Sequence, residues 1–298
     1  MSKHTDLVHL GRDPKSQHGV VNLPVYHAST ILYPNIAAFK NRAVGDRKYR
    51  GVRYGAYGTP TNFALADAMA ELEGGAGGVV TSSGLAAVTM ALTAFLNSGD
   101  HLLMVDSVYT PTRDFCDSVL GRLGVETTYY DPLIGEGIAK LIRSNTRVVF
   151  TESPGSLTFE VQDIPAIAAA AHQRDVLILM DNTWAKPFFF KPFEHGVDIS
   201  IQAGTKYLSG GSDLVIGIIT ASEKAVARMV DNYRYFRIGA SWGGFESLVI
   251  PADPAAYRTA VPWEASGYLL RYHVGLEDTE DLISDLAEGF QILDWQPK

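Results

Sequence analysis

The hydrophobic residues between positions 78 and 201 fall into two alternating patterns. Short runs that are apolar at almost every position are typical of strands covered on both faces, and segments with apolar residues every three or four positions are typical of helices. Strands are predicted at 78–81, 101–105, 125–130, 148–151, 176–180 and 199–201, and helices at 85–96, 112–123, 136–142 and 164–174. This alternation predicts a mostly parallel, doubly wound α/β sheet.

The two ends of the chain follow other patterns. Gly, Pro, Tyr and Arg are common in residues 1–60, and this segment has no sustained helical period. It is therefore predicted to be an extended N-terminal arm, of the kind that wraps around another subunit. The α/β pattern occupies 61–233. Residues 234–298 combine a Pro-rich loop, an extended segment and a helix, which predicts a shortened α+β C-terminal domain too small to bury a large core alone.

Composition narrows the classes of function. The chain has 298 residues, of which 46% are hydrophobic and 19% charged, so disorder and a coiled coil are excluded. A formal net charge of −8 with scattered Lys and Arg argues against nucleic acid as a partner. No apolar stretch approaches the length of a bilayer span, so no membrane partner is expected. The single Cys116 and a polar N-terminal segment favour a reducing, cytoplasmic location.

Candidate chemistry is expected where strands end, because ligands of open α/β sheets bind beyond the carboxyl ends of the strands. Polar residues stand there at 82–84, 106–109, 181–183 and 202–206. The hydroxyls and glycine of 82–84 precede a long helix, so backbone N–H groups could hold a phosphate. The same residues are also typical of a tight turn with a serine N-cap.

Asp181 and Lys206 are two of the charged residues at these strand ends. Asp181 either caps the residues after it or faces a cationic ligand. Lys206 lies among small residues, where a desolvated amine is a nucleophile toward carbonyls and a surface amine is only solvated. A lysine, an aspartate and a phosphate-binding helix start together are what pyridoxal phosphate requires, and Tyr109 could stack on its ring.

Motifs along nearly the whole chain point to one family. They are VVNLPVYHAST (20–30), ELEGG (71–75), SSGLAA (82–87), DSVY (106–109), ESPGS (152–156), DNTW (181–184), TKY (205–207), SWGGFES (241–247) and RYHVGLE (271–277). On these motifs the chain resembles the Cys/Met-metabolism family of fold-type I pyridoxal-phosphate enzymes. The ESPGS and SWGG motifs resemble its β-lyase branch more than its γ-lyases and γ-synthases.

The resemblance implies a role for each matching residue. Lys206 would bond the cofactor and remove the substrate's Cα proton, Asp181 would hold the ring nitrogen, and Tyr109 would stack on the ring and assist proton transfer. The other implied contacts are Gly84, Leu85, Thr205 and a neighbouring subunit's Tyr54 for the cofactor, and Arg271 and Ser241 for the substrate. No metal is expected, since the eight histidines are dispersed singly.

The activity that the resemblance implies is cleavage of the Cβ–S bond of L-cystathionine or a related cysteine thioether, in a homo-oligomer of two or four subunits. Two departures keep an alternative open. Ala56 stands where the family has an arginine, and the chain joins the helix ending near Tyr233 directly to the segment at Ser241, without the family's intervening stretch. The alternatives are a cofactor-binding but catalytically impaired scaffold, or another member of the family.

A nucleotide-binding α/β module is a weaker alternative from a different class. The chain has no G-x-G-x-x-G motif and no P-loop lysine, the two signatures that such modules use to hold phosphates. We therefore expect the phosphate site at 82–84 to serve a cofactor rather than a nucleotide.

Overall fold

The computed structural model describes residues 3–40, 52–156, 158–210, 213–221, 248–252 and 269–273, in two compact units, Met1–Tyr233 and Arg234–Lys298. The α-helices of the first unit are α1 (Lys3–His9), α2 (Ile36–Lys40), α3 (Pro60–Glu73), α4 (Gly84–Phe95), α5 (Thr110–Phe115), α6 (Ile164–His172) and α7 (Lys186–Phe189). Its strands are β1 (Gly77–Thr81), β2 (His101–Val105), β3 (Glu126–Tyr130), β4 (Thr146–Glu152), β5 (Leu177–Asp181), β6 (Ile199–Gln202) and β7 (Gly217–Ala221).

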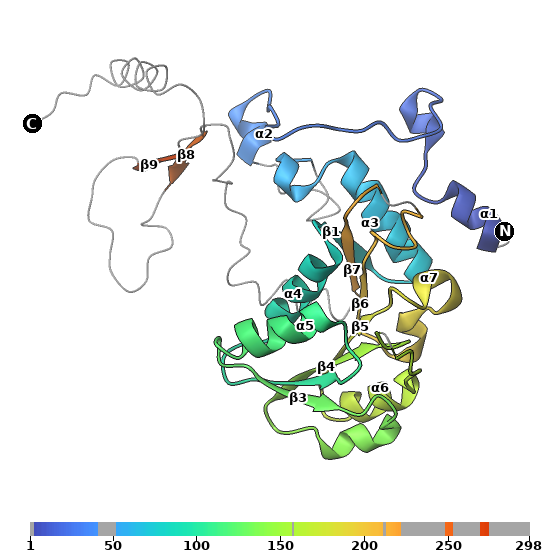
Figure 1. The fold of residues 1–298 in the computed structure, drawn as a ribbon. Coiled ribbons are helices and arrows are strands. Elements are labelled where there is room, and N and C mark those ends of the chain that lie inside the picture. The colour runs from blue at the N-terminus through green and yellow to red at the C-terminus, as the bar shows by residue number, and fades with distance from the viewer. Residues whose placement is uncertain are drawn as a thin grey trace, which may run out of the picture. The chain divides into compact units, whose positions relative to one another are not determined.

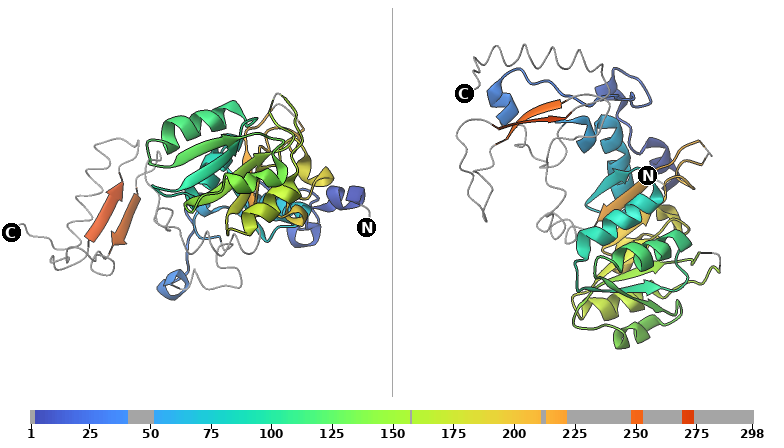
Figure 2. Two further views of the ribbon diagram at one scale, coloured as in Figure 1. Left: turned by 90° about the horizontal axis from the view of Figure 1, so that it is seen from below. Right: turned by 60° about the vertical axis from the view of Figure 1, so that its left-hand side comes forward.

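The seven strands of the first unit form one sheet in the order β1-β7-β6-β5-β4-β2-β3 (Figure 1). Strands β6, β5, β4, β2 and β3 pair in parallel, and β7 pairs antiparallel with both β1 and β6. Helices α4 and α5 lie on one face and α6 on the other (Figures 1 and 2). The predicted α/β class with a mostly parallel, doubly wound sheet is confirmed.

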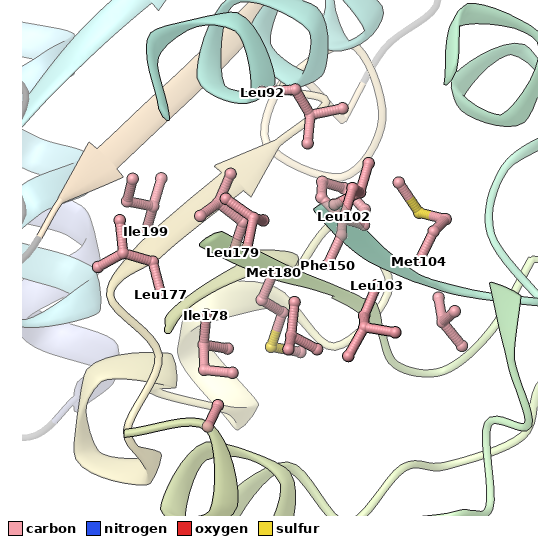
Figure 3. Packing of buried hydrophobic residues seen from close by; sticks show 14 of the residues in the cluster. Leu92, Leu102, Leu103, Met104, Phe150, Leu177, Ile178, Leu179, Met180 and Ile199 are labelled. Carbon is pink, nitrogen blue, oxygen red and sulfur yellow. The ribbon is translucent and has the colours of Figure 1, made fainter. Parts of the chain in front are cut away.

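The core lies between these helices and the sheet. Figure 3 shows neighbouring positions pointing to opposite faces, Leu102 and Leu179 toward Leu92 of α4, Leu103 and Ile178 away from it. All five side chains are fully buried. Strands apolar at successive positions are therefore needed here, because each face is covered by helices.

The observed elements differ from the predicted ones in several places. Strand β7 was absent from the predicted set, because five residues bounded by glycine-rich sequence carry little period of their own. The helix predicted at 112–123 is α5 followed by a π-helical turn at Cys116–Leu120, before Gly121 and Gly124. The helix predicted at 136–142 is a 3-10 helix at Gly135–Lys140, whose two glycines weaken a regular α-helix.

The N-terminal arm carries two short helices, α1 and α2, joined by extended chain. It is tied to the start of α3, where the Thr61 hydroxyl accepts a hydrogen bond from the Tyr26 N–H (3.0 Å) and donates one to the Pro24 carbonyl (2.9 Å). Large apolar side chains of the arm, such as Leu32 and Ile36, are exposed. Among the described residues, no helix is long and apolar enough to cross a membrane.

The second unit is described at two strands, β8 (Leu248–Ala252) and β9 (Leu269–His273). They form an antiparallel pair in which Ile250 lies opposite Arg271. The extended segment that the sequence predicts near Arg271 is thus part of a two-stranded sheet.

Candidate functional site

The four groups of polar residues predicted at strand ends, 82–84, 106–109, 181–183 and 202–206, meet at the carboxyl edge of the sheet. They follow β1, β2, β5 and β6, which run in the same direction because β7 pairs antiparallel with both β1 and β6, so these residues emerge on the same side. Two hydrogen bonds connect this edge: the Ala203 N–H donates to Thr183 Oγ1 (2.8 Å), and the Tyr109 N–H donates to Oε2 of Glu152, the last residue of β4 (2.8 Å). The edge is therefore a connected set of loops around a candidate site.

Helix α4 begins at this edge with the geometry of an anion site. Ser83 is its N-cap, and the Ser83 hydroxyl accepts a hydrogen bond from the Ala86 N–H (3.0 Å). Among the described residues, the N–H groups of Gly84 and Leu85 donate no hydrogen bond. Two unbonded amides at the start of a 12-residue helix are what a phosphate requires.

Gly84 is required where the helix start meets the loop after β6. A Cβ at this position would lie 2.5 Å from the Cβ of Ala203, closer than two carbon atoms can approach. The absence of a side chain therefore lets the loop that carries Lys206 pack against the start of α4. This contact brings the predicted phosphate site and the predicted lysine to the same place.

Two carboxyl groups stand side by side at the ends of β4 and β5, where Glu152 and Asp181 are partners in the parallel register. The Thr183 N–H donates to Asp181 Oδ1 (3.0 Å). Burial raises the pKa of Asp181, and burial together with the neighbouring Asp181 raises the pKa of Glu152 to about 8. Such a pair favours a positively charged ligand atom.

Lys206 lies within the turn after β6 and is exposed to solvent. This exposure agrees with the second of the two sequence alternatives, a solvated amine, and the role of Lys206 as a nucleophile stays a prediction. The neighbouring Thr205 hydroxyl donates to the Ile216 carbonyl (3.2 Å) and accepts from the Ile216 N–H (3.0 Å). Thr205 thus anchors the turn to the segment before β7, and Lys206 projects from an anchored position.

The Tyr109 side chain is 48% exposed, so its ring is free to stack on a ligand at the edge. Its backbone is held by Glu152 and begins helix α5 as the N-cap residue. A fixed backbone with an exposed ring is suited to stacking on a flat cofactor.

The remaining predicted residues are Tyr54, Arg271 and Ser241. Tyr54 precedes a 3-10 turn at Gly55–Tyr57, and its ring contacts that of Tyr57 at 6.5 Å. Arg271 lies in β9 of the second unit, where its backbone alone is described. Ser241 lies outside the described residues. The roles of these three residues stay predictions.

Glu152 is the site residue that sequence reasoning missed. The ESPGS motif contains it, but the preceding strand was predicted to end at residue 151, so Glu152 was given no role. Strand β4 continues to Glu152, which places this side chain beside Asp181. An acidic residue at the end of an otherwise apolar run was the signal that could have found it.

The donor set fits pyridoxal phosphate. Its phosphate matches the unbonded amides of α4, its ring nitrogen matches the carboxyl pair, and its aldehyde matches an amine on the same edge. Among the described residues, no group of three or more His, Cys, Asp or Glu side chains could hold a metal ion.

The comparisons with known proteins agree with this chemistry. The family model described as "Cys/Met metabolism PLP-dependent enzyme" matches residues 4–229 and 220–291. The cystathionine β-lyases of Escherichia coli and Salmonella typhimurium are 34% and 35% identical, each with 96% of this chain and 97% of the relative covered. A solved cystathionine γ-lyase from Lactobacillus plantarum, complexed with L-serine, has a TM-score of 0.69 at 30% identity.

The lengths of these matches differ from the length of the chain. Both bacterial alignments run over 385 positions, although this chain has 298 residues. The chain covers 57% of the solved γ-lyase, while 77% of this chain is matched. The relatives therefore contain residues that have no counterpart here, as the direct join before Ser241 predicts.

Proposed function

Because the chain belongs to the Cys/Met-metabolism family of pyridoxal-phosphate-dependent enzymes, we propose that it is a carbon–sulfur β-lyase acting on L-cystathionine or a related cysteine thioether. The observation that carries the proposal is the gathering of the α4 amides, Asp181, Tyr109 and Lys206 at one sheet edge. The names of the two bacterial β-lyases support the choice of bond.

Each part of the cofactor has its own holder in this proposal. The N–H groups of Gly84 and Leu85 hold the phosphate, and the Thr205 hydroxyl joins them by turning its proton from the Ile216 carbonyl to the phosphate. Asp181 holds the protonated ring nitrogen. The ring lies against Tyr109, and Lys206 bonds the aldehyde. When bound, pyridoxal phosphate withdraws electrons from the Cα atom of an amino acid.

The side chains of this chain then move the protons. The Lys206 amine removes the Cα proton of the substrate, and Asp181 keeps the ring nitrogen protonated so that it accepts negative charge. The substrate carboxylate binds Arg271, with Ser241 beside it, and Tyr109 assists proton transfer. With L-cystathionine, cleavage of Cβ–S leaves homocysteine, and hydrolysis of the remaining three-carbon fragment gives pyruvate and ammonia.

A homo-oligomer completes the site in this proposal, because Tyr54 would reach the cofactor of a neighbouring subunit. The exposed apolar side chains of the N-terminal arm support an association of this kind. Sedimentation of the full chain would test it, and a monomer that forms pyruvate would contradict the shared site.

A catalytically impaired scaffold is the second candidate, favoured by Ala56 and by the stretch that the relatives have and this chain lacks. Ala56 replaces the arginine that the family has after Tyr54, so a neighbouring subunit would contribute less to phosphate binding here. The two candidates differ in one observable, the release of pyruvate from a bound substrate.

The test is pyruvate release from L-cystathionine by the full chain with added pyridoxal phosphate. We expect Lys206→Ala to lose at least about 10³-fold in rate, because the base and the covalent anchor are the same amine. Lys140→Ala, at an exposed lysine of the Gly135–Lys140 turn, is the matched control and should keep the rate.

Borohydride reduction followed by peptide mass spectrometry locates the covalent bond. The expected pyridoxyl mass lies on the peptide that contains Lys206, and a label on another lysine would contradict the proposal. A labelled Lys206 without pyruvate release would favour the scaffold, and release of 2-oxobutyrate instead of pyruvate would favour a γ-lyase.

A further inference from the structure

Glu152 occupies the centre of the candidate site. Strand β4 lies between β5 and β2 in the sheet, so the end of β4 separates Asp181 from the loop that carries Tyr109. Glu152 Oε2 accepts a hydrogen bond from the Tyr109 N–H (2.8 Å), and its carboxyl group neighbours Asp181 across the β4–β5 register. One side chain thus connects two residues of the proposed cofactor site.

The groups around Glu152 leave its charge uncompensated. From the β2 side comes the Tyr109 N–H, from β5 the Asp181 carboxyl, and from the segment before α6 the uncharged Gln162, whose amide donates to the Glu152 carbonyl (2.7 Å). Within the described part of the chain, neither carboxyl forms an ion pair with Lys, Arg or His.

Two neighbouring carboxyls of this kind are costly without a positively charged partner. Only 4% of Glu152 is exposed, and a buried carboxylate without a positive partner is strongly disfavoured. Like charges at short range also prevent both groups from ionising together. The pair therefore holds a proton until a cationic group arrives between or beside the two carboxyls.

We propose that Glu152 is a positioning residue that, together with Asp181, forms a two-carboxyl site selecting the protonated ring nitrogen of the cofactor. The inference rests on the proposed function, in which Asp181 faces that nitrogen. A ring nitrogen carrying a proton supplies the missing positive charge, and the second carboxylate then strengthens its hold on the proton. Through its hydrogen bond with the Tyr109 N–H, Glu152 also fixes the backbone position of Tyr109, whose ring stacks on the cofactor.

The first test measures the ring nitrogen itself. The full chain is loaded with ¹⁵N-labelled pyridoxal phosphate, and the ¹⁵N chemical shift is followed against pH for the unmodified chain and for Glu152→Gln. Glutamine retains an acceptor for Tyr109 and removes the charge. We expect the nitrogen of Glu152→Gln to lose its proton at a pH lower by about one unit or more, a tenfold weaker hold.

Two further variants separate this inference from the proposed function. In Asp181→Asn, the ring nitrogen should lose its proton at a lower pH whether or not Glu152 is present. Glu126→Gln is the control: it changes an exposed carboxylate at the start of β3, and its ring nitrogen should titrate as in the unmodified chain. If Asp181→Asn releases the proton and Glu152→Gln does not, the inference fails and the proposed function stands. If neither releases it over the range in which both stay folded, the assignment of Asp181 fails too.

A second measurement uses the unmodified chain, so it does not depend on the folding of any Glu152 variant. The Tyr109 amide donates to Glu152 Oε2, and its chemical shift therefore reports the ionisation of this carboxyl. With ¹⁵N-tyrosine labelling, and Tyr109→Phe to assign the signal, we expect its pH midpoint to fall when pyridoxal phosphate is added. A midpoint that stays or rises would overturn the inference.

Discussion

A second buried carboxyl group, Glu73 at the end of α3, shows how a single residue connects the helix layer to the sheet. The Ser200 hydroxyl and the Gln202 amide both donate to Glu73 Oε1, at 2.7 and 2.9 Å. Gln202 also donates to the Asn182 carbonyl (3.2 Å), next to Asp181. Glu73 therefore supports the strand end that precedes Lys206.

The first prediction concerns the pH dependence that Glu73 imposes. Burial raises the pKa of Glu73 above 4.5, so the folded chain holds this proton at pH values where the unfolded chain has released it. The contribution of this bound proton to the free energy of unfolding is complete below about pH 4.5 and declines as the pH rises. The free energies of unfolding of the unmodified chain and Glu73→Gln should diverge above that pH by at most about 1.4 kcal/mol per pH unit.

Urea denaturation at pH 4.5, 6 and 7.5 measures this difference. Glu126→Gln is again the control, since the Arg143 hydrogen bond and charge lower the pKa of Glu126, and the sign of its pH dependence is opposite. Equal pH slopes for the unmodified chain and Glu73→Gln would contradict a protonated Glu73.

Several candidate site residues could be predicted from the sequence because they stand directly after apolar strands. Asp181, Tyr109 and Lys206 were found in this way, and the structure places them at the same edge. Glu152 was missed because the end of β4 was predicted one residue early. The choice between a desolvated and a solvated Lys206 stayed open because neighbouring residues in sequence do not report solvent access.

At the scale of elements, the start of α4 and the loop after β6 depend on one contact. Gly84 allows Ala203 to approach, and the same approach leaves the first amides of α4 facing the edge. Helix α4 was predicted correctly within one residue from its apolar period and its serine cap. Its neighbour across the edge was not predictable, because the two are separated by more than a hundred residues.

The second prediction tests this contact. Gly84→Ala should destabilise the chain by about 1–3 kcal/mol and weaken binding of pyridoxal phosphate, because the added Cβ lies 2.5 Å from that of Ala203. Adding Ala203→Gly to the same chain removes the opposing methyl group and should restore most of both losses. Thermal unfolding and cofactor titration measure them, and a double variant as impaired as Gly84→Ala would refute the steric explanation.

For the whole molecule, cofactor binding should raise the free energy of unfolding, because a ligand that binds only the folded state shifts the equilibrium toward that state. We expect pyridoxal phosphate at a hundredfold excess over its dissociation constant to add about 2.7 kcal/mol to the unfolding free energy. Pyridoxal, which lacks the phosphate, should add less at the same concentration, because it leaves the α4 amides unbonded. Calorimetry of the full chain compares the two, and equal effects would refute the phosphate site.

The fold class followed from the sequence alone, because the alternation of apolar runs and helical periods is a local property. The antiparallel strand β7 did not, since its five residues pair with β1 and β6 from distant parts of the chain. The division into 61–233 and 234–298 stays a prediction from composition. Local periodicity carries information about each element but little about which distant element it pairs with.

The sequence by itself determined the family, the polar residues at the strand ends and the cofactor that their chemistry fits. The tertiary structure alone decided that Glu152 lies beside Asp181 and bonds Tyr109, and that Gly84 meets Ala203. The physical reason is that residue type and spacing fix local chemistry, whereas charge coupling and steric contact depend on distances that arise only when remote strands pair.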